Sequence, residues 1–146
     1  MRVPVLFCVS LVVALVSCKS RHPVAVDSRE TADLPRDSAV QKLGELLPTV
    51  DYVYCTAPKW SLKASEISKW NILSEGIFFD HGKGNVLRLS YADITDVRVE
   101  ASSRYFSVKV YSVVQTDASK DHFQFLFKAE DRAKQVAELL LSLKKK

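Results

Sequence analysis

Histidine, cysteine and glycine-rich motifs are scarce in this sequence, and the scarcity excludes several kinds of site. The 146 residues include three histidines and three cysteines. His22, His81 and His122 do not have the short spacings of a zinc site, so the simpler interpretation is that each is solvated. Gly82-Lys83-Gly84 lacks the long glycine spacing and the Lys-Ser/Thr pair of a phosphate loop, which favours a tight turn. We therefore expect no bound metal and no cofactor.

Catalytic motifs and strong charge are also lacking. No Gly-x-Ser-x-Gly nucleophile motif occurs, and Asp93 is better explained as a local backbone cap than as a catalytic acid. Lysine and arginine number 21 against 17 aspartates and glutamates, a formal net charge of +4 without a concentrated basic stripe. That balance does not suit a nucleic-acid-binding protein. We expect neither enzymatic activity nor nucleic-acid binding.

The first 17 residues have the layout of a secretory signal. Arg2 precedes an apolar run from Val3 to Val16, and the small residue Ser17 follows it. A helix that spans a bilayer needs roughly 20 apolar residues, so this run is too short to cross comfortably. We expect residues 1–17 to be removed on export, with a retained anchor as the alternative.

The end of this segment, Leu15-Val16-Ser17-Cys18, resembles the lipobox of bacterial lipoproteins. The resemblance implies cleavage after Ser17, a diacylglycerol thioether on Cys18, and acylation of the new α-amino group, for example by palmitate. Two or three acyl chains hold a small domain at a bilayer almost permanently. Because Lys19 is not the aspartate associated with inner-membrane retention, the resemblance favours the outer membrane in a cell with two membranes. The alternative is ordinary secretion, with Cys18 an incidental thiol.

The three cysteines offer no disulfide framework. Cys8 lies in the segment lost on export, and lipidation of Cys18 leaves Cys55 without an intramolecular partner. Cys55 belongs to the apolar run Val53-Tyr54-Cys55, which favours a buried thiol over a nucleophile.

Residues 18–37 are expected to form the lipidated cysteine and a flexible tether. The stretch 19–37 has mixed charges, two prolines and no sustained apolar period, as a solvated segment does. Ser38 is a suitable cap for a short helix over 39–47, which Pro48 ends. The folded domain is therefore expected over 38–146.

The remainder of the chain shows the alternation of short β-strands, followed by one helix. Apolar residues alternate with polar ones between turn signals, which predicts seven strands over 50–56, 67–73, 77–80, 86–91, 94–100, 105–114 and 122–128. From Glu130 to Leu143 the apolar spacing becomes helical. The predicted fold class is mainly β with a C-terminal α-helix.

Several of these segments resemble parts of bacterial pleckstrin-homology-like and GRAM-like domains. They are Gly76-Ile77-Phe78-Phe79, the stretch 91–97, Phe123-Gln124-Phe125 and the alanine-containing terminal helix. The resemblance implies a bent antiparallel barrel of about seven strands whose open end is closed by the helix. Another small barrel or α+β domain is the alternative.

Lysines and tryptophans surround the first connection between predicted strands: Lys59, Trp60, Lys63, Lys69 and Trp70. In pleckstrin-homology domains this region binds phosphoinositide headgroups. The Lys/Arg-x-Arg pattern of that site is missing, and an exported bacterial protein does not normally meet phosphoinositides. Tryptophans of the core or its rim with solvated lysines are the simpler interpretation, and a patch for a lipid headgroup or glycan is the alternative.

Together these features predict a membrane-anchored bacterial lipoprotein. Its exported domain is expected to act as a non-catalytic binding or scaffold module in the cell envelope, with a protein or an anionic envelope component as partner. One alternative is a small envelope enzyme or transport accessory protein with a site assembled from dispersed polar residues. Another is a purely structural lipoprotein that acts by oligomerising.

Overall fold

The computed structural model describes residues 21–27, 29–80, 86–115, 117 and 119–145, and this part of the chain is mainly β. Six strands form sheet A in the order β1-β7-β8-β9-β2-β3, and three form sheet B in the order β4-β5-β6. Every pairing between these strands is antiparallel. The strands of sheet A are β1 (His22–Val24), β2 (Tyr52–Thr56), β3 (Lys59–Lys63), β7 (Ile94–Ala101), β8 (Phe106–Ser112) and β9 (His122–Phe127). Those of sheet B are β4 (Asn71–Ile72), β5 (Gly76–Asp80) and β6 (Val86–Ser90).

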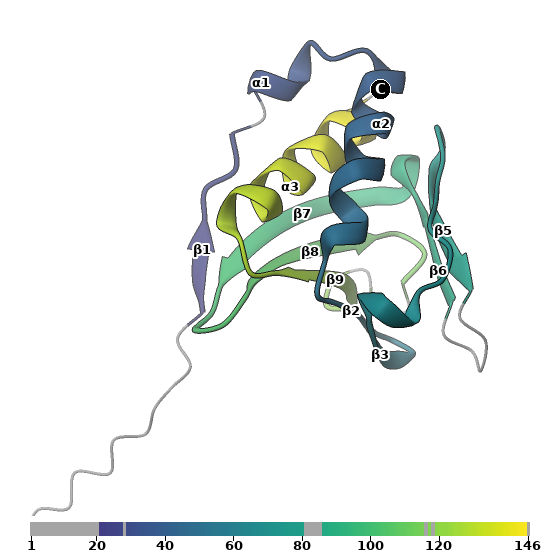
Figure 1. The fold of residues 1–146 in the computed structure, drawn as a ribbon, viewed down its shortest axis with the longest axis vertical. Helices are drawn as coiled ribbons and strands as arrows, with labels where there is room; N and C mark the ends of the chain where they lie inside the picture. Colours follow the sequence, from purple (N-terminus) through teal and green to yellow (C-terminus); the bar gives the residue numbers. More distant parts are fainter. Residues whose placement is uncertain (1–20, 28, 81–85, 116, 118, 146) are drawn as a thin grey trace, which may run out of the picture.

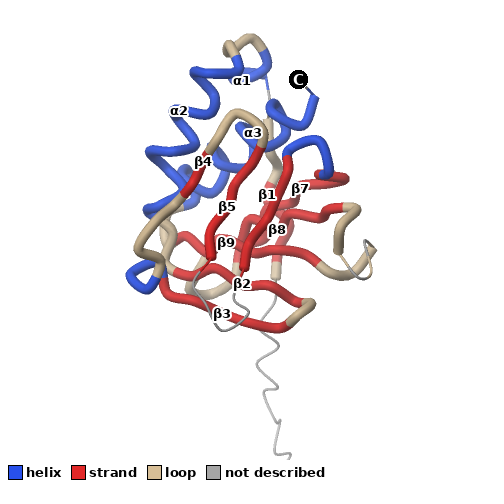
Figure 2. Tube along the Cα trace, turned by 90° about the vertical axis from the view of Figure 1, so that its right-hand side faces the viewer, coloured by secondary structure: helices blue, strands red, loops and turns tan. Residues whose placement is uncertain are grey.

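The described helices lie together on one side of sheet A. They are α1 (Arg29–Ala32), α2 (Arg36–Leu46) and α3 (Glu130–Lys145), with short 3-10 turns η1 (Leu47–Thr49), η2 (Ala64–Glu66) and η3 (Tyr91–Asp93). Figure 1 shows α3 lying across β7 and β8, with α2 beside it. Sheet B stands across the direction of sheet A (Figure 2). The predicted class, mainly β with a C-terminal helix, is confirmed, and the bent arrangement is open rather than a closed barrel.

The core fills the space between the helices and the inner faces of both sheets. The apolar residues that alternate along each strand, and those at helical spacing along α3, point into this core, as predicted. Burying one such aliphatic or aromatic side chain contributes roughly 1.5–3 kcal/mol. Representative members with almost no exposed surface are Leu43, Leu47, Val53, Ile77, Leu87, Leu89, Tyr91, Val99, Val108, Val110, Phe125, Phe127, Val136, Ala137 and Leu140.

The strands β3 and β4 differ from the sequence prediction. The segment 59–63 was expected to be a connection, but it forms β3 with Trp60 and Leu62 in the core and its other side chains exposed. The strand predicted over 67–73 contracts to β4, because residues 67–70 form an irregular segment that leads from η2 into the strand. The strand predicted over 105–114 ends at Ser112, so Val114 lies beyond the end of β8 and is 58% exposed.

The segment before α2 also differs from the expected flexible tether. Residues 22–24 pair with β7, His22 opposite Ala101 and Val24 opposite Val99. This pairing covers a strand edge that would otherwise present unpaired backbone groups. The helix α2 begins at Arg36 rather than after a Ser38 cap, with Pro35 at its N-cap position. Residues 1–20, including the proposed signal and Cys18, lie outside the described residues.

Candidate functional site

The outer face of sheet A, opposite the core, carries the polar side chains of its central strands. Because side chains alternate along a strand, the paired residues Lys109, Gln124 and Tyr54 all lie on this face. Glu100 and Ser107 form the neighbouring pair on the same face. Polar residues from four strands therefore converge where the sequence alone shows only separate alternating patterns.

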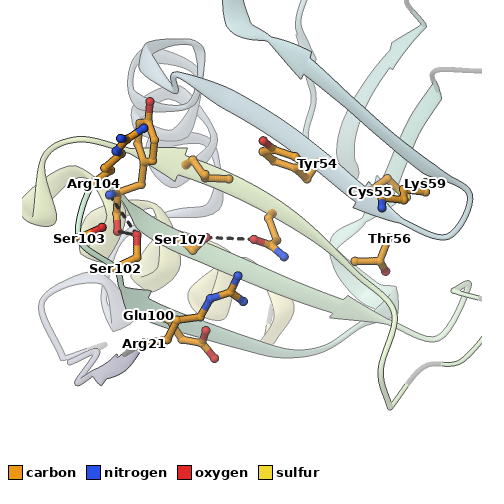
Figure 3. Close-up of a pocket in the computed structure, with 13 residues that line it drawn as sticks. Arg21, Tyr54, Cys55, Thr56, Lys59, Glu100, Ser102, Ser103, Arg104 and Ser107 are labelled. Carbon is orange, nitrogen blue, oxygen red and sulfur yellow. Dashed lines mark hydrogen bonds between the residues drawn. The ribbon is translucent and has the colours of Figure 1, made fainter. Parts of the chain in front are cut away.

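A pocket of about 560 Å³ opens on this face (Figure 3). Its walls come from β2, β3, β7, β8, β9, the turn between β7 and β8, and the residue just before β1. Figure 3 shows Arg104 and Arg21 toward the β7–β8 turn and Lys59 at the far end. The lining residues are Arg21, Tyr54, Cys55, Thr56, Lys59, Glu100, Ser102, Ser103, Arg104, Tyr105, Ser107, Gln124 and Leu126.

A hydrogen-bond chain runs along the outer face from the pocket to β9. The Ser107 hydroxyl donates to Gln124 Oε1 at 3.1 Å, and Gln124 Nε2 lies 2.7 Å from His122 Nε2. Since an amide nitrogen can only donate, His122 Nε2 accepts and its Nδ1 carries the proton donated to the Lys120 carbonyl at 2.7 Å. The chain therefore holds a neutral imidazole, and burial lowers the pKa of His122.

This environment differs from the solvated one expected for His122. Its ring is half-buried and lies 5.0 Å, centroid to centroid, from the Tyr111 ring. His22 is exposed, in line with the sequence, and His81 lies outside the described residues.

Lys109 neutralises the charge of Glu100, the one acidic side chain among the described residues that line the pocket. Lys109 Nζ lies 2.7 Å from Glu100 Oε2, and the two side chains are 10% and 26% exposed. Lys109 alternates with the apolar residues of β8 and so lies on the outer face of the sheet, yet it is buried. A charge buried this far persists only when it is paired. Glu100 therefore adds little negative charge to the pocket.

The rim of the pocket carries uncompensated positive charge. Arg21, Lys59 and Arg104 are exposed, and none of them forms an ion pair within the described residues. Arg104 lies in a tight turn in which the Ser102 amide donates to the Tyr105 carbonyl at 2.9 Å and the Tyr105 amide donates to the Ser102 hydroxyl at 3.2 Å. This turn therefore holds Arg104 at the rim of the pocket, where no carboxylate of the described residues pairs with it.

Aromatic side chains form the less polar part of the wall. Tyr54 is exposed, and Tyr105 packs edge-on against Tyr52 with ring centroids 5.8 Å apart. A pocket that combines guanidinium groups, hydroxyls and tyrosine rings suits a ligand with an anionic group and an adjoining neutral part.

The structure separates the lysines of the sequence-predicted patch. Lys59 lines the pocket, and Lys63 projects from the same side of β3. Lys69 is exposed in the segment before β4 and does not line the pocket. Only one of the three lysines therefore belongs to the candidate site.

The tryptophans of that patch belong to the core side of the molecule. Trp60 and Trp70 each pack edge-on against Phe79, with ring centroids 5.9 Å and 5.3 Å apart. Trp60 is buried and Trp70 is partly buried. Their position agrees with the interpretation of tryptophans in or beside the core.

The side chains of Cys55 and Ser142 form hydrogen bonds with backbone carbonyl groups. Cys55 is buried, as predicted, its thiol lies 3.5 Å from the Ala57 carbonyl oxygen, and burial raises the pKa of that thiol. Ser142 lies three residues before Lys145, a Ser-x-x-Lys spacing, but its buried hydroxyl donates to the Thr31 carbonyl at 3.0 Å. Cys18 and Ser17 lie outside the described residues.

Among the described residues, no three histidine, cysteine, aspartate or glutamate side chains gather closely enough to hold a metal ion. In the same part of the chain, no helix combines the length and apolar character needed to cross a membrane.

Comparisons of the chain with protein-family models, with curated proteins and with solved structures found no match. The resemblances to bacterial lipoproteins and to pleckstrin-homology-like domains therefore stay predictions from the sequence. The chemistry of the site has to be derived from its own geometry.

Proposed function

We propose that this protein is an exported lipoprotein, anchored through Cys18, whose domain binds an anionic component of the cell envelope without catalysis. The observation that carries the proposal is the pocket on the outer face of sheet A. Arg21, Lys59 and Arg104, three cations without an ion pair among the described residues, surround it, while Lys109 neutralises Glu100 in its lining. The anchor is supported by the lipobox-like Leu15-Val16-Ser17-Cys18.

The polar groups of the pocket suit binding better than nucleophilic catalysis. The Ser107 hydroxyl donates to the amide oxygen of Gln124, which separates it from His122. A serine nucleophile needs a base within hydrogen-bond reach, and among the described residues the hydrogen bonds of the pocket serines give none of them such a partner. Arginine side chains, in contrast, bind carboxylate or phosphate groups with two parallel hydrogen bonds.

The anchor is tested by metabolic labelling with a fatty acid analogue. We expect wild-type protein to incorporate the label and Cys18→Ala to lose it. Cys8→Ala is the matched control, because it removes a cysteine from the same N-terminal region without touching the proposed lipid site. Unlabelled wild type, or label retained in Cys18→Ala, would overturn the anchor.

The binding site is tested by photo-crosslinking in the intact cell envelope. A photoreactive side chain at Ser103, in the pocket, should capture an envelope component, whereas the same group at the exposed Ser65 of η2 should not. Neutralising the rim with Arg21→Gln and Arg104→Gln should abolish the adduct. Adducts that form equally at both positions, or that survive the loss of both cations, would contradict a pocket selective for anions.

A further inference from the structure

The pocket lies close to the point at which the proposed lipid anchor begins. The pairing of His22 with Ala101 puts Arg21 beside the β7–β8 turn, and Arg21 itself lines the pocket. Only two residues separate Arg21 from Cys18. Three peptide steps span at most about 11 Å, so the Cα atoms of Cys18 and Arg21 are no further apart than that.

That short reach fixes which end of the domain faces the bilayer. The glyceryl group of an acylated cysteine lies at the boundary between headgroups and acyl chains. The separation of about 11 Å is the upper limit for a fully extended segment, and a more compact path shortens it toward about 8 Å, the Debye length at physiological ionic strength, within which charges are only partly screened from the headgroups. Arg104 within the β7–β8 turn and Arg21 beside it are therefore held within electrostatic range of the membrane surface.

We infer that the pocket receives the phosphate headgroup of an anionic lipid in the same membrane that holds Cys18. The inference rests on the proposed lipid anchor and names the ligand of the proposed binding site. The guanidinium groups of Arg21 and Arg104, which form no ion pair among the described residues, supply the donors for phosphate oxygens, and Ser103 adds a hydroxyl at the same end.

The membrane accounts for this site better than a freely diffusing anion does. The anchor keeps the pocket beside a surface on which headgroups are present at high effective concentration, so a weak phosphate contact is still occupied. Tyr54 and Tyr105 in the wall suit a membrane–water interface, where aromatic rings with a polar end gather. The domain would thus rest on the membrane by the end of sheet A that carries the β7–β8 turn.

The test uses the full lipidated protein in two kinds of vesicle, phosphatidylcholine alone and an equal mixture of phosphatidylcholine and phosphatidylglycerol. Hydrogen exchange of the amides in the turn 102–105 reports contact with the surface. We expect slower exchange in the anionic vesicles, with α3 unchanged as an internal reference. Exchange in the turn that is the same in both vesicles would overturn the inference.

Charge variants locate the contact on the pocket. Arg21→Gln with Arg104→Gln should remove the slowing, whereas Arg88→Gln with Arg132→Gln, two exposed arginines on β6 and α3, should keep it. We expect each lost cation to weaken the contact roughly five-fold, since a basic residue near an anionic surface contributes about 1 kcal/mol. If both double variants lose the slowing of exchange equally, the effect depends only on the net charge of the protein. That result would overturn the pocket as the site of contact.

A third arm distinguishes the sources of phosphate. Glycerol phosphate is added in solution to the protein in phosphatidylcholine vesicles, at the total phosphate concentration of the anionic vesicles. Slowing only by the anionic membrane supports the lipid headgroup, and slowing only by the soluble ester overturns it. If labelling shows that Cys18 carries no lipid, the proposed function fails first; a lipidated protein without slowing contradicts only this inference.

Discussion

The ion pair of Lys109 and Glu100 matters for stability because the sheet buries it. A lysine on a strand is normally solvated, and the sequence gives no sign that this one is covered. In the structure both are largely withdrawn from water and lie 2.7 Å apart. Burial makes the loss of either partner costly, because the remaining charge or polar group keeps its desolvation penalty.

We predict that Glu100→Gln lowers the free energy of unfolding by about 1–3 kcal/mol, since it leaves the Lys109 ammonium partly buried and unpaired. The control is Glu130→Gln, which breaks the Lys134–Glu130 pair of the same 2.7 Å length between side chains that are 36% and 44% exposed. That exposed pair should cost less than about 0.5 kcal/mol. Urea denaturation measures both variants, and equal losses would contradict the role assigned to burial.

His122 gives the molecule a predictable dependence on pH. Burial is the main cause that lowers the pKa of His122 below 6.5, with the Lys109 charge acting in the same direction. Below pH 6.5 the unfolded chain therefore binds more protons than the folded one, and the free energy of unfolding falls as the pH falls. The histidine contribution is fully present above that value and is lost as the pH decreases through the folded pKa.

We accordingly expect wild-type stability to decrease between pH 7 and pH 5 more steeply than that of His122→Gln, which cannot titrate. Denaturation midpoints measured across this range test the difference. Stability curves with the same slope in both proteins would show that His122 titrates in the folded state as it does in the unfolded one.

At the scale of elements, two glycines differ in whether their surroundings leave room for a side chain. Gly44 lies inside α2 with open space around the position of a Cβ, whereas a Cβ on Gly76 at the start of β5 would collide with the carbonyl oxygen of Leu89 on β6. Glycine in a helix costs about 0.5–1 kcal/mol relative to alanine. Close approach of two backbones, in contrast, leaves no room for a side chain.

Gly44→Ala should therefore raise the free energy of unfolding by about 0.5–1 kcal/mol, and Gly76→Ala should lower it, typically by about 1–3 kcal/mol for a forced shift of packed groups. Thermal or urea unfolding of the two variants beside the wild type measures both signs. A neutral Gly76→Ala would mean that β5 and β6 can separate without loss of packing.

Local sequence patterns predict some of the strands and helices but not others. Strands with regular alternation, such as β6 and β9, and the helical spacing of α3 were predicted because each pattern is local. Trp60 and Leu62 alternate with polar residues as well, so β3 could have been found from the same rule. The strand β1 could not, because three residues show no period and pair only with a strand far along the chain.

The candidate site was out of reach for the same physical reason. Lys59 was singled out from the sequence, but Arg21, Arg104 and Gln124 were not. Their proximity depends on the register of β7, β8, β9 and β2 and on the pairing of β1, all of them long-range contacts. No spacing in the sequence brings these residues together.

At the scale of the whole molecule, the helix α3 packs against elements of sheet A and against the short turn η3 that follows sheet B. It packs against α2, β7, β8 and η3, and Leu140 is fully buried near its centre. The strand β1, in contrast, is a short edge strand with mostly exposed side chains. The central strands should therefore open only when the whole domain unfolds, while β1 should open by itself.

Leu140→Ala separates these two kinds of opening. The cavity should cost about 2–5 kcal/mol, so amide exchange in β8 and β9 should accelerate at least about 30-fold where it follows global unfolding. Exchange in β1 should keep its wild-type rate, because local detachment does not involve α3. Acceleration of β1 by the same factor would mean that it belongs to the global unit, and that Arg21 stays at the pocket for as long as the domain is folded. Unchanged exchange in β1 would confirm that this strand detaches locally while the rest of the domain stays folded.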